Sequence, residues 1–248
     1  MSASKISVAK KAINYIEKKL FKDMVIGIGT GSTVNFFIKE LSSLKNHFKG
    51  AVSSSNASSE LLKEIGVEVF NLNDVNEVSF YIDGADEVSP ENFLIKGGGG
   101  AHTREKIVAA ASKEFVCIVD ESKLVKKLGA FPLPIEVIPE SRSMVSRKII
   151  AMGGLPEYRK GFLTDQGNQI IDVKNLSINE PEALEILINN IPGVVDNGLF
   201  AFNKPNIVLV GEWSKEVFLY QKLVQQNLAL QKIHMLKQQF HLLISNTY

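Results

Sequence analysis

The stretch Met24-Val25-Ile26-Gly27-Ile28-Gly29-Thr30-Gly31-Ser32-Thr33 joins a short apolar run to a glycine turn that ends in hydroxyl side chains. The residues from Val34 through Leu41 and Leu44 then place apolar side chains at helical spacing. In an α/β unit, phosphate binds where a strand, a glycine turn and a helix follow one another. Two known templates fail, because the dinucleotide pattern needs glycine at Ser32 and the nucleotide P-loop needs a lysine. The turn fits a small phosphate or sugar hydroxyls, and a plain tight turn fits it about as well.

The first 130 residues continue this alternation of strand and helix. One helix ends at Gly66 and another begins near Lys106. Further strands are predicted at Ala51-Val52, Val67 to Phe70, Val78 to Ile82 and Phe115 to Val119, and Ile207 to Val210 returns to the same sheet. Alternation of this kind predicts an α/β fold, namely a Rossmann-like domain with a mostly parallel sheet. We assign it residues 1–131 and 207–248.

A second, smaller α+β domain is predicted for residues 132–206. Phe131-Pro132-Leu133-Pro134 marks the change in character. Beyond it the sequence predicts a helix over Arg142 to Met152, a hairpin, a helix from Glu182 to Asn189 and a strand near Val194-Val195. The hairpin is expected to pair Phe162-Leu163-Thr164 with Gln169 to Val173 across the turn at Asp165 to Asn168.

The last segment, residues 214–248, is rich in glutamine and carries apolar residues at helical spacing. It predicts an amphipathic helical tail outside the catalytic apparatus. Packing on its own protomer, contact with a second subunit and poor order are all compatible with this pattern. We favour a homodimer, because an exposed apolar stripe needs a partner.

Composition excludes several classes of protein. The net charge is +1, from 28 basic and 27 acidic residues, which gives no reason to expect nucleic acid or an anionic membrane as a partner. Cys117 is the only cysteine, so an internal disulfide is excluded. No apolar window reaches the ~18 residues of a membrane span, and no signal-peptide core follows Met1. The sequence predicts a soluble, cytoplasmic protein.

Chemistry is concentrated in the stretch Lys96-Gly97-Gly98-Gly99-Gly100-Ala101-His102-Thr103-Arg104-Glu105. Four glycines expose backbone N–H groups that a ligand can approach, and a following helix points its positive end at the same place. With Lys96 on one side and Glu105 on the other, the stretch predicts an anion site beside a base. A flexible linker is the alternative. His102 is expected to be a loop-surface histidine.

The acidic turn Asp83-Gly84-Ala85-Asp86-Glu87 follows a predicted strand directly. A solvated turn and a magnesium site are two interpretations of three close carboxylates. Because Lys96 and the glycine loop favour an anionic, hydroxyl-rich ligand, we expect these carboxylates to accept sugar hydroxyls or to move their protons. Lys123 adds a further cation nearby, and no metal ion is expected.

In combination and order, these motifs resemble type A ribose-5-phosphate isomerase over about residues 8 to 211. The motifs that carry the resemblance are Gly29 to Thr33, Asp83 to Glu87, Lys96 to Gly99 with Thr103 to Lys106, Phe131 to Pro139, Gly154 to Arg159 and Ile191 to Val195.

The resemblance implies an aldose–ketose isomerase that interconverts D-ribose 5-phosphate and D-ribulose 5-phosphate in the non-oxidative pentose phosphate pathway, without cofactor or metal. It makes Glu105 the base that moves a proton between C2 and C1 through an enediolate. Lys96 would stabilise the oxyanion, and Asp83 would assist ring opening. Substrate binding is implied for Asp83 and Lys96 as well, and for Thr30, Gly31, Ser32, Thr33, Gly84, Ala85, Asp86, Gly97, Gly98, Gly99 and Lys123.

The sequence departs from the family pattern in two places. The tail beyond Trp213 is longer than the family's usual end, and an N-terminal lysine that should help to bind phosphate is not clearly either Lys10 or Lys11. A deaminase or an acyl-CoA transferase is a competing enzyme class. A non-catalytic sugar-phosphate sensor is the competing function, although a sensor has no use for Glu105 beside Lys96.

Overall fold

The computed structural model describes residues 2–211 and 217–219. Its largest element is a sheet of seven strands in the order β14-β13-β7-β4-β1-β2-β3, and every pairing except that of β14 is parallel. In chain order, the parallel strands follow the 3-2-1-4-5-6 arrangement of a doubly wound Rossmann sheet. The strands are β1 (Val25–Ile28), β2 (Gly50–Ser53), β3 (Val69–Phe70), β4 (Val78–Asp83), β7 (Ser112–Asp120), β13 (Ile207–Gly211) and β14 (Val217–Leu219). The predicted parallel sheet and the return of the chain at residue 207 are confirmed.

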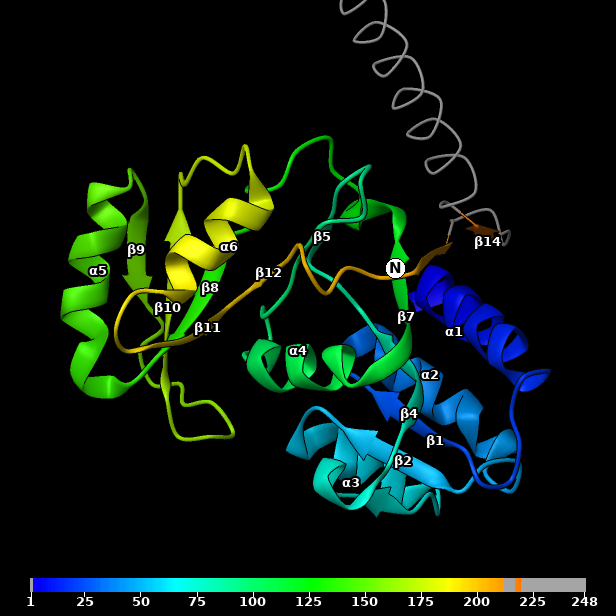
Figure 1. Cartoon of the computed structure of the whole chain (residues 1–248). Coiled ribbons are helices and arrows are strands. Elements are labelled where there is room, and N and C mark those ends of the chain that lie inside the picture. Colours follow the sequence, from blue (N-terminus) through cyan, green and yellow to red (C-terminus); the bar gives the residue numbers. More distant parts are fainter. Residues whose placement is uncertain (1, 212–216, 220–248) are drawn as a thin grey trace, which may run out of the picture.

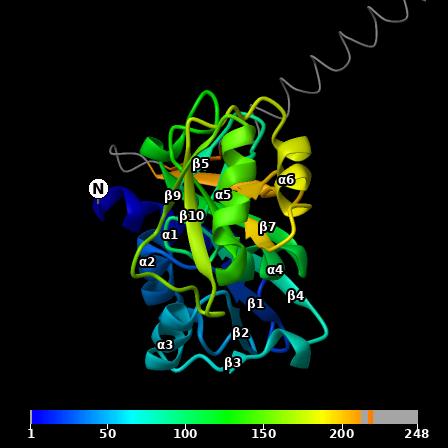
Figure 2. The ribbon, with the colours of Figure 1, turned by 90° about the vertical axis from the view of Figure 1, so that its left-hand side faces the viewer.

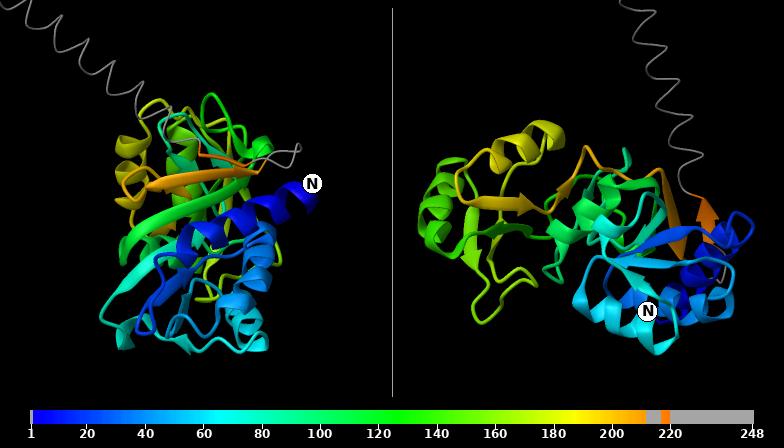
Figure 3. Two further views of the ribbon diagram at one scale, coloured as in Figure 1. Left: turned by 90° about the vertical axis from the view of Figure 1, so that its right-hand side faces the viewer. Right: turned by 60° about the horizontal axis from the view of Figure 1, so that its bottom comes forward.

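Helices cover both faces of this sheet (Figures 1 and 3). On one face, α1 (Ser2–Glu17) and α2 (Ser32–Leu41) pack on each other and on the strands, and α3 (Asn56–Glu64) lies beside β2. On the other face, α4 (His102–Ala110) packs on β4 and β7. The sheet is therefore buried on both sides, which accounts for its continuous apolar strands.

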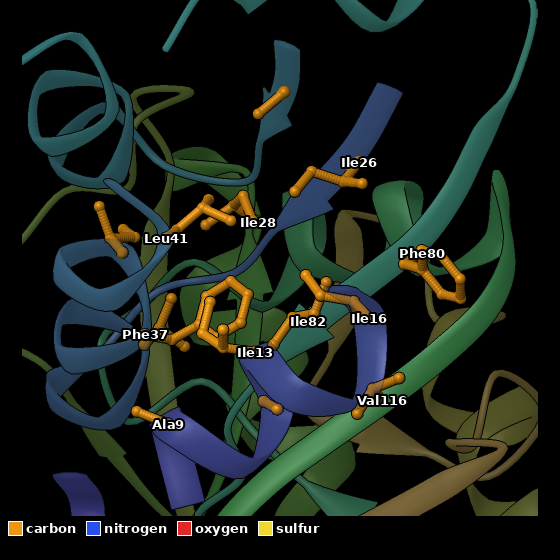
Figure 4. Packing of buried hydrophobic residues seen from close by; sticks show 14 of the residues in the cluster. Ala9, Ile13, Ile16, Ile26, Ile28, Phe37, Leu41, Phe80, Ile82 and Val116 are labelled. Atoms are coloured by element: carbon orange, nitrogen blue, oxygen red, sulfur yellow. The ribbon is translucent and has the colours of Figure 1, made fainter. Parts of the chain in front are cut away.

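The first helix, α1, is an element that the sequence analysis did not identify. Five of its apolar residues recur at helical spacing and are buried in the core that α1 shares with α2 and the sheet (Figure 4): Val8, Ala9, Ala12, Ile13 and Ile16. Burying each larger apolar side chain contributes ~1.5–3 kcal/mol. The Ser4 hydroxyl also donates to the Gly211 carbonyl at 2.8 Å, so α1 is fixed against the end of β13.

A second unit lies beside the first and contains an antiparallel sheet of four strands in the order β11-β8-β10-β9 (Figures 1 and 2). Its own core joins this sheet to α5 (Arg142–Ala151) and α6 (Pro181–Asn189). The strands are β8 (Leu133–Val137), β9 (Leu155–Tyr158), β10 (Gln169–Lys174) and β11 (Val194–Asn197). A smaller three-stranded sheet joins the two units through β5 (Glu87–Val88), β6 (Leu94–Ile95) and β12 (Leu199–Phe200).

The predicted hairpin is wrong in its first strand. The partner of β10 is β9, with Tyr158 opposite Ile171, and Phe162–Thr164 belong to the connection between the two strands. In this connection Leu163 is exposed, whereas the side chains of Phe162 and Thr164 contact other parts of the chain. Phe162 lies against Gly100, and the Thr164 hydroxyl donates to Glu136 at 2.8 Å.

The predicted helical tail is wrong for Val217–Leu219, which form β14 antiparallel to β13. A strand at this place covers the backbone groups of β13, which would otherwise be an open sheet edge. Residues 212–216 and 220–248 lie outside the described part of the chain. Among the described residues, none of the helices combines the length and the apolar character needed to cross a bilayer.

Candidate active site

A cleft lies at the carboxyl ends of β1 and β4, the place where strand order reverses in the large sheet. Doubly wound sheets bind their ligands at this crevice. The residues that line it come from the turns after β1, β4, β6 and β7 and from the helices α1, α2 and α4: Lys5, Thr30, Gly31, Ser32, Thr33, Gly84, Ala85, Asp86, Lys96, Gly97, Gly98, Gly99, Glu105 and Lys123. Of the site residues predicted from sequence, Asp83 alone is absent from this lining.

Asp83 lies directly behind the cleft wall, as the last residue of β4, and is fully buried. Its Oδ1 accepts hydrogen bonds from the backbone N–H groups of Thr30 at 3.1 Å and Gly84 at 2.7 Å. The Tyr81 hydroxyl donates to its Oδ2 at 2.5 Å. Only glycine fits at position 29, because a Cβ there would lie 1.9 Å from Cγ of Asp83. The interpretation of this turn as a solvated acidic loop is therefore wrong for Asp83.

Lys96 follows β6 and places its ammonium group between two carboxylates. Its Nζ lies 2.7 Å from Oδ2 of Asp83 and 3.2 Å from Oε2 of Glu105, and it donates to the Gly84 carbonyl at 2.5 Å. Burial by itself lowers the pKa of Lys96, but the charges of Asp83 and Glu105 outweigh it and raise that pKa above 10.5. The site therefore contains a fixed cation at neutral pH.

Glu105 lies in the first turn of α4, with 3% of its surface exposed. Burial, followed by the charge of Asp83, raises its pKa from 4.5 to about 8, against the opposing effect of Lys96. Its Oε2 receives no well-aligned hydrogen bond from the described residues, although Nζ of Lys96 is close. A buried carboxylate whose pKa is raised to about 8, and whose Oε2 is paired with Lys96 but accepts no well-aligned hydrogen bond from the described residues, is suited to take up a proton.

The glycine loop forms the wall opposite the β1 turn. Gly97 has φ +101°, a conformation that favours glycine, and Gly98 donates its N–H to Oδ2 of Asp86 at 2.8 Å. Because this loop is a wall of the cleft with defined hydrogen bonds, the linker interpretation is wrong. Glu87 differs from its neighbours in the acidic turn, since its carboxylate points away and accepts from the N–H groups of Gly129 and Phe131.

The β1 turn, residues 30–33, presents hydroxyls and N–H groups at the N-terminus of α2. A helix N-terminus with free N–H groups attracts phosphate. Lys5 of α1 reaches the same place and donates to the Ser32 hydroxyl at 2.7 Å. The N-terminal lysine of the cleft is thus Lys5, and neither Lys10 nor Lys11 lines it. Lys123, after β7, supplies the second cation of the rim.

His102 is not a surface residue, as the sequence analysis expected. It is fully buried at the start of α4, with Nε2 at 3.4 Å from the Asp196 carbonyl oxygen. Burial and then the charge of Lys106 lower its pKa to about 3. The ring is therefore neutral across the physiological range. The prediction of a surface position for His102 is wrong because β11, which covers this side of α4, is far away along the chain.

The described residues contain no cluster of three or more His, Cys, Asp or Glu side chains arranged to hold a metal ion. What the cleft does offer is a proton-accepting carboxylate, a buried cation and two sets of backbone N–H groups. Together with the doubly wound sheet, this arrangement defines an α/β enzyme that performs acid–base chemistry on a small anionic substrate.

Comparisons with known proteins identify the family. The sequence pattern of ribose 5-phosphate isomerase A (phosphoriboisomerase A) matches residues 50–215. The ribose-5-phosphate isomerase A of Legionella pneumophila (strain Philadelphia 1) is 56% identical over 214 residues, covering 86% of this chain and 97% of that protein. The Haemophilus influenzae protein of the same name is 53% identical over 204 residues, covering 82% and 91%.

Solved structures agree with this. The crystal structure of ribose 5 phosphate isomerase A from Neisseria gonorrhoeae has a TM-score of 0.81 and 48% identity, covering 88% of this chain and 96% of that one. A D-ribose-5-phosphate isomerase in complex with phospho-erythronic acid has a TM-score of 0.82 and 37% identity, covering 88% and 99%. The chain belongs to the ribose 5-phosphate isomerase A family.

Proposed function

We propose that this chain is a ribose-5-phosphate isomerase, which converts D-ribose 5-phosphate and D-ribulose 5-phosphate into each other in the non-oxidative pentose phosphate pathway. The observation that carries the proposal is the position of the Lys96 ammonium, 2.7 Å from Asp83 and 3.2 Å from Glu105, at the edge of a phosphate-sized turn. A relative of the same fold binds phospho-erythronic acid, a phosphorylated sugar acid. The cleft described above offers donors for the phosphate group and for the hydroxyl groups of such a compound.

Glu105 is the general base in this proposal. It takes the proton from C2 of the open-chain aldose, which leaves an enediolate with its negative charge on O1. The hydroxyl proton then passes from O2 to O1, and Glu105 returns a proton to C1 as the C2 carbonyl forms. One carboxylate serves both carbons, because the proton taken from the first is released to the second. The raised pKa of Glu105, about 8, makes both the uptake and the release of a proton feasible near neutral pH.

Lys96 stabilises the negative charge that develops on the oxygens of the enediolate. Its pKa lies above 10.5, so it acts as a fixed positive charge and not as a proton donor at neutral pH. Asp83, behind the cleft wall, holds Lys96 in place, and through Lys96 it assists the opening of the furanose ring, which exposes the C1 carbonyl. A preorganised cation next to a developing oxyanion is typically one of the larger contributions to such catalysis.

The phosphate group binds at the N-terminus of α2, where Thr30 to Thr33 offer N–H and hydroxyl donors and Lys5 adds charge. The sugar then extends toward Glu105, between Asp86 with Gly97 to Gly99 on one side and Gly84 with Ala85 on the other. Lys123 completes the pocket at the rim. A sensor that binds the same sugar phosphate is the disfavoured alternative, since it has no use for a buried base beside Lys96.

The direct test is an assay of the purified protein with ribose 5-phosphate, performed with and without EDTA. We expect ribulose 5-phosphate to form at the same rate in both samples, because Lys96 supplies the positive charge that a metal would otherwise provide. A protein that binds ribose 5-phosphate but never converts it would be a sensor. Loss of activity with EDTA and recovery with a divalent ion would mean that the acidic turn binds metal.

The pH profile of kcat/KM should report the ionisation of Glu105 in the free enzyme. The base must be unprotonated, and its pKa is about 8, so kcat/KM should rise with pH up to that value and then level off. Lys96 retains its charge throughout, since its pKa is raised. A rise of kcat/KM centred at or below about pH 6 would contradict this assignment, because the phosphate monoester of the substrate ionises in that range.

We further propose that the protein is a cytoplasmic homodimer, and that residues 1–131 with 207–248 and residues 132–206 are its two domains. Family membership and the separate cores of the two units support these proposals. Ile150, Leu155 and Leu163 expose more than half of their surface on the smaller unit, where a second subunit could cover them. A solution mass near 27.4 kDa would contradict the dimer.

A further inference from the structure

Arg159 reaches from the smaller unit to the back of the glycine loop. It follows β9 directly, and its guanidinium donates to two successive carbonyl oxygens of the loop. Nη1 lies 3.3 Å from the Gly97 oxygen and 3.2 Å from the Gly98 oxygen, and Nη2 lies 3.2 Å from the Gly97 oxygen. Arg159 itself does not line the cleft. It contacts the side of the loop that faces away from the substrate site.

The guanidinium is held in place by its own partners. Asp172 of β10 accepts from it with both oxygens, at 2.8 Å from Nε and 2.5 Å from Nη2. The Phe162 ring lies 5.3 Å from its Cζ and packs against Gly100 on its other side. A planar group with a bidentate carboxylate and an aromatic neighbour has little freedom to move. Arg159 is therefore a rigid anchor for the loop.

The anchor orients the peptide units of the loop together with two hydrogen bonds, from the Gly100 N–H to the Gly97 carbonyl at 2.9 Å and from the Gly98 N–H to Asp86 at 2.8 Å. In a trans peptide the carbonyl and the N–H of one unit point in opposite directions. The Gly97 and Gly98 carbonyls point at Arg159, so the N–H groups of Gly98 and Gly99 point toward the cleft. The Gly98 N–H donates to Asp86, and the Gly99 N–H has no acceptor among the described residues.

Glycines alone cannot maintain this orientation. Without a Cβ, a run of glycines has access to many backbone conformations, and each peptide unit can turn over at low cost. A cation on the carbonyl side favours one orientation. It also polarises the two peptide units, which strengthens their N–H groups as donors.

We infer that Arg159 is a positioning residue for the proposed isomerisation: it holds the Gly97–Gly98 and Gly98–Gly99 peptide units with their N–H groups toward the sugar. The inference rests on the proposed function, and it gives the smaller unit a part in building the site. Arg159 acts through the loop and does not contact the substrate.

The test compares Arg159→Met and Arg159→Lys with Arg142→Met as the matched control. Arg142 is also an arginine of the smaller unit, stacked 4.2 Å from the Tyr158 ring and bonded to Gln169, with no contact to the glycine loop. We expect Arg159→Met to lower kcat/KM by about 10- to 100-fold, the scale of a misplaced binding group. Arg159→Lys should recover only part of this loss, because one ammonium cannot hold two carbonyls and both oxygens of Asp172. The control should stay within about twofold of wild type, because Arg142 neither lines the cleft nor bonds to the glycine loop.

Equilibrium binding separates positioning from a structural role. Inorganic phosphate occupies the α2 turn alone, so Arg159→Met should bind it as wild type does. Phospho-erythronic acid also carries a sugar-acid portion, which the proposed binding mode places at the glycine loop, so its affinity should fall by about tenfold or more. Equal affinity for phospho-erythronic acid in the variant and wild type would overturn the inference. A variant that binds inorganic phosphate more weakly and also melts at a lower temperature would overturn it too, because Arg159 would then have a structural role. If Arg159→Met fails to fold, the same comparisons on Arg159→Lys decide. An inactive wild type would instead refute the proposed function.

Discussion

Glu105→Gln is expected to abolish isomerisation while the protein still folds and binds ribose 5-phosphate. The amide keeps the shape of the side chain but cannot take a proton from C2, and general-base catalysis is typically worth about 10²–10⁴-fold in rate. The measurement is kcat in a continuous assay, with substrate binding determined by calorimetry. Glu121→Gln, which changes an exposed carboxylate outside the cleft, is the matched control.

The same variant should not be less stable than wild type, which separates loss of the base from loss of the fold. The folded-state pKa of Glu105, about 8, lies above its ordinary value of 4.5. Burial therefore costs stability increasingly as pH rises from 4.5 to about 8. Glutamine avoids this cost, so the melting temperature at pH 9 should be equal to or higher than that of wild type. A variant that keeps more than about a third of wild-type kcat would show that Glu105 is not the base.

Lys96→Met should have the second large effect, on both rate and stability. It removes the cation that faces the enediolate, a change that typically costs about 10²–10³-fold in kcat. It also leaves the carboxylates of Asp83 and Glu105 buried without their partner, and breaking a buried ion pair costs about 3–5 kcal/mol in the free energy of unfolding. Turnover numbers and chemical denaturation measure the two effects.

A double variant, Lys96→Met with Asp83→Asn, distinguishes chemistry from folding. Removing the unpaired charge at Asp83 should restore much of the stability, and the protein should still be inactive. If the double variant is stable and its kcat exceeds about a tenth of the wild-type value, Lys96 contributes to the fold and not to the reaction.

The features that the sequence predicted correctly depend on residues that are close together in the chain. The strand, glycine turn and helix around Gly29 to Thr33, the acidic turn after β4 and the glycine loop before α4 are each local patterns. Parallel strands bring their carboxyl ends to one edge, so these patterns implied a common cleft. The cleft contains every predicted binding residue except Asp83, which supports it from behind.

The features that the sequence analysis missed depend on contacts between distant residues. Lys5 reaches Ser32 only because α1 packs on α2, and α1 itself was overlooked. Its apolar spacing, from Val8 to Ile16, was a signal that could have identified it. The Arg159 anchor joins residues 62 and 61 positions apart in the chain, and nothing in the local sequence around Arg159 indicates the carbonyls that it contacts.

Hydrogen exchange with solvent tests the central claim, that Glu105 moves a proton between C2 and C1 through an enediolate. The wild-type protein and Glu105→Gln are incubated with ribose 5-phosphate in D₂O for many turnovers, and the sugars are examined by NMR. Wild type should place deuterium at C2 of the aldose and at C1 of the ketose, and the variant should place none. Conversion or deuterium exchange by Glu105→Gln at the wild-type rate would contradict the mechanism.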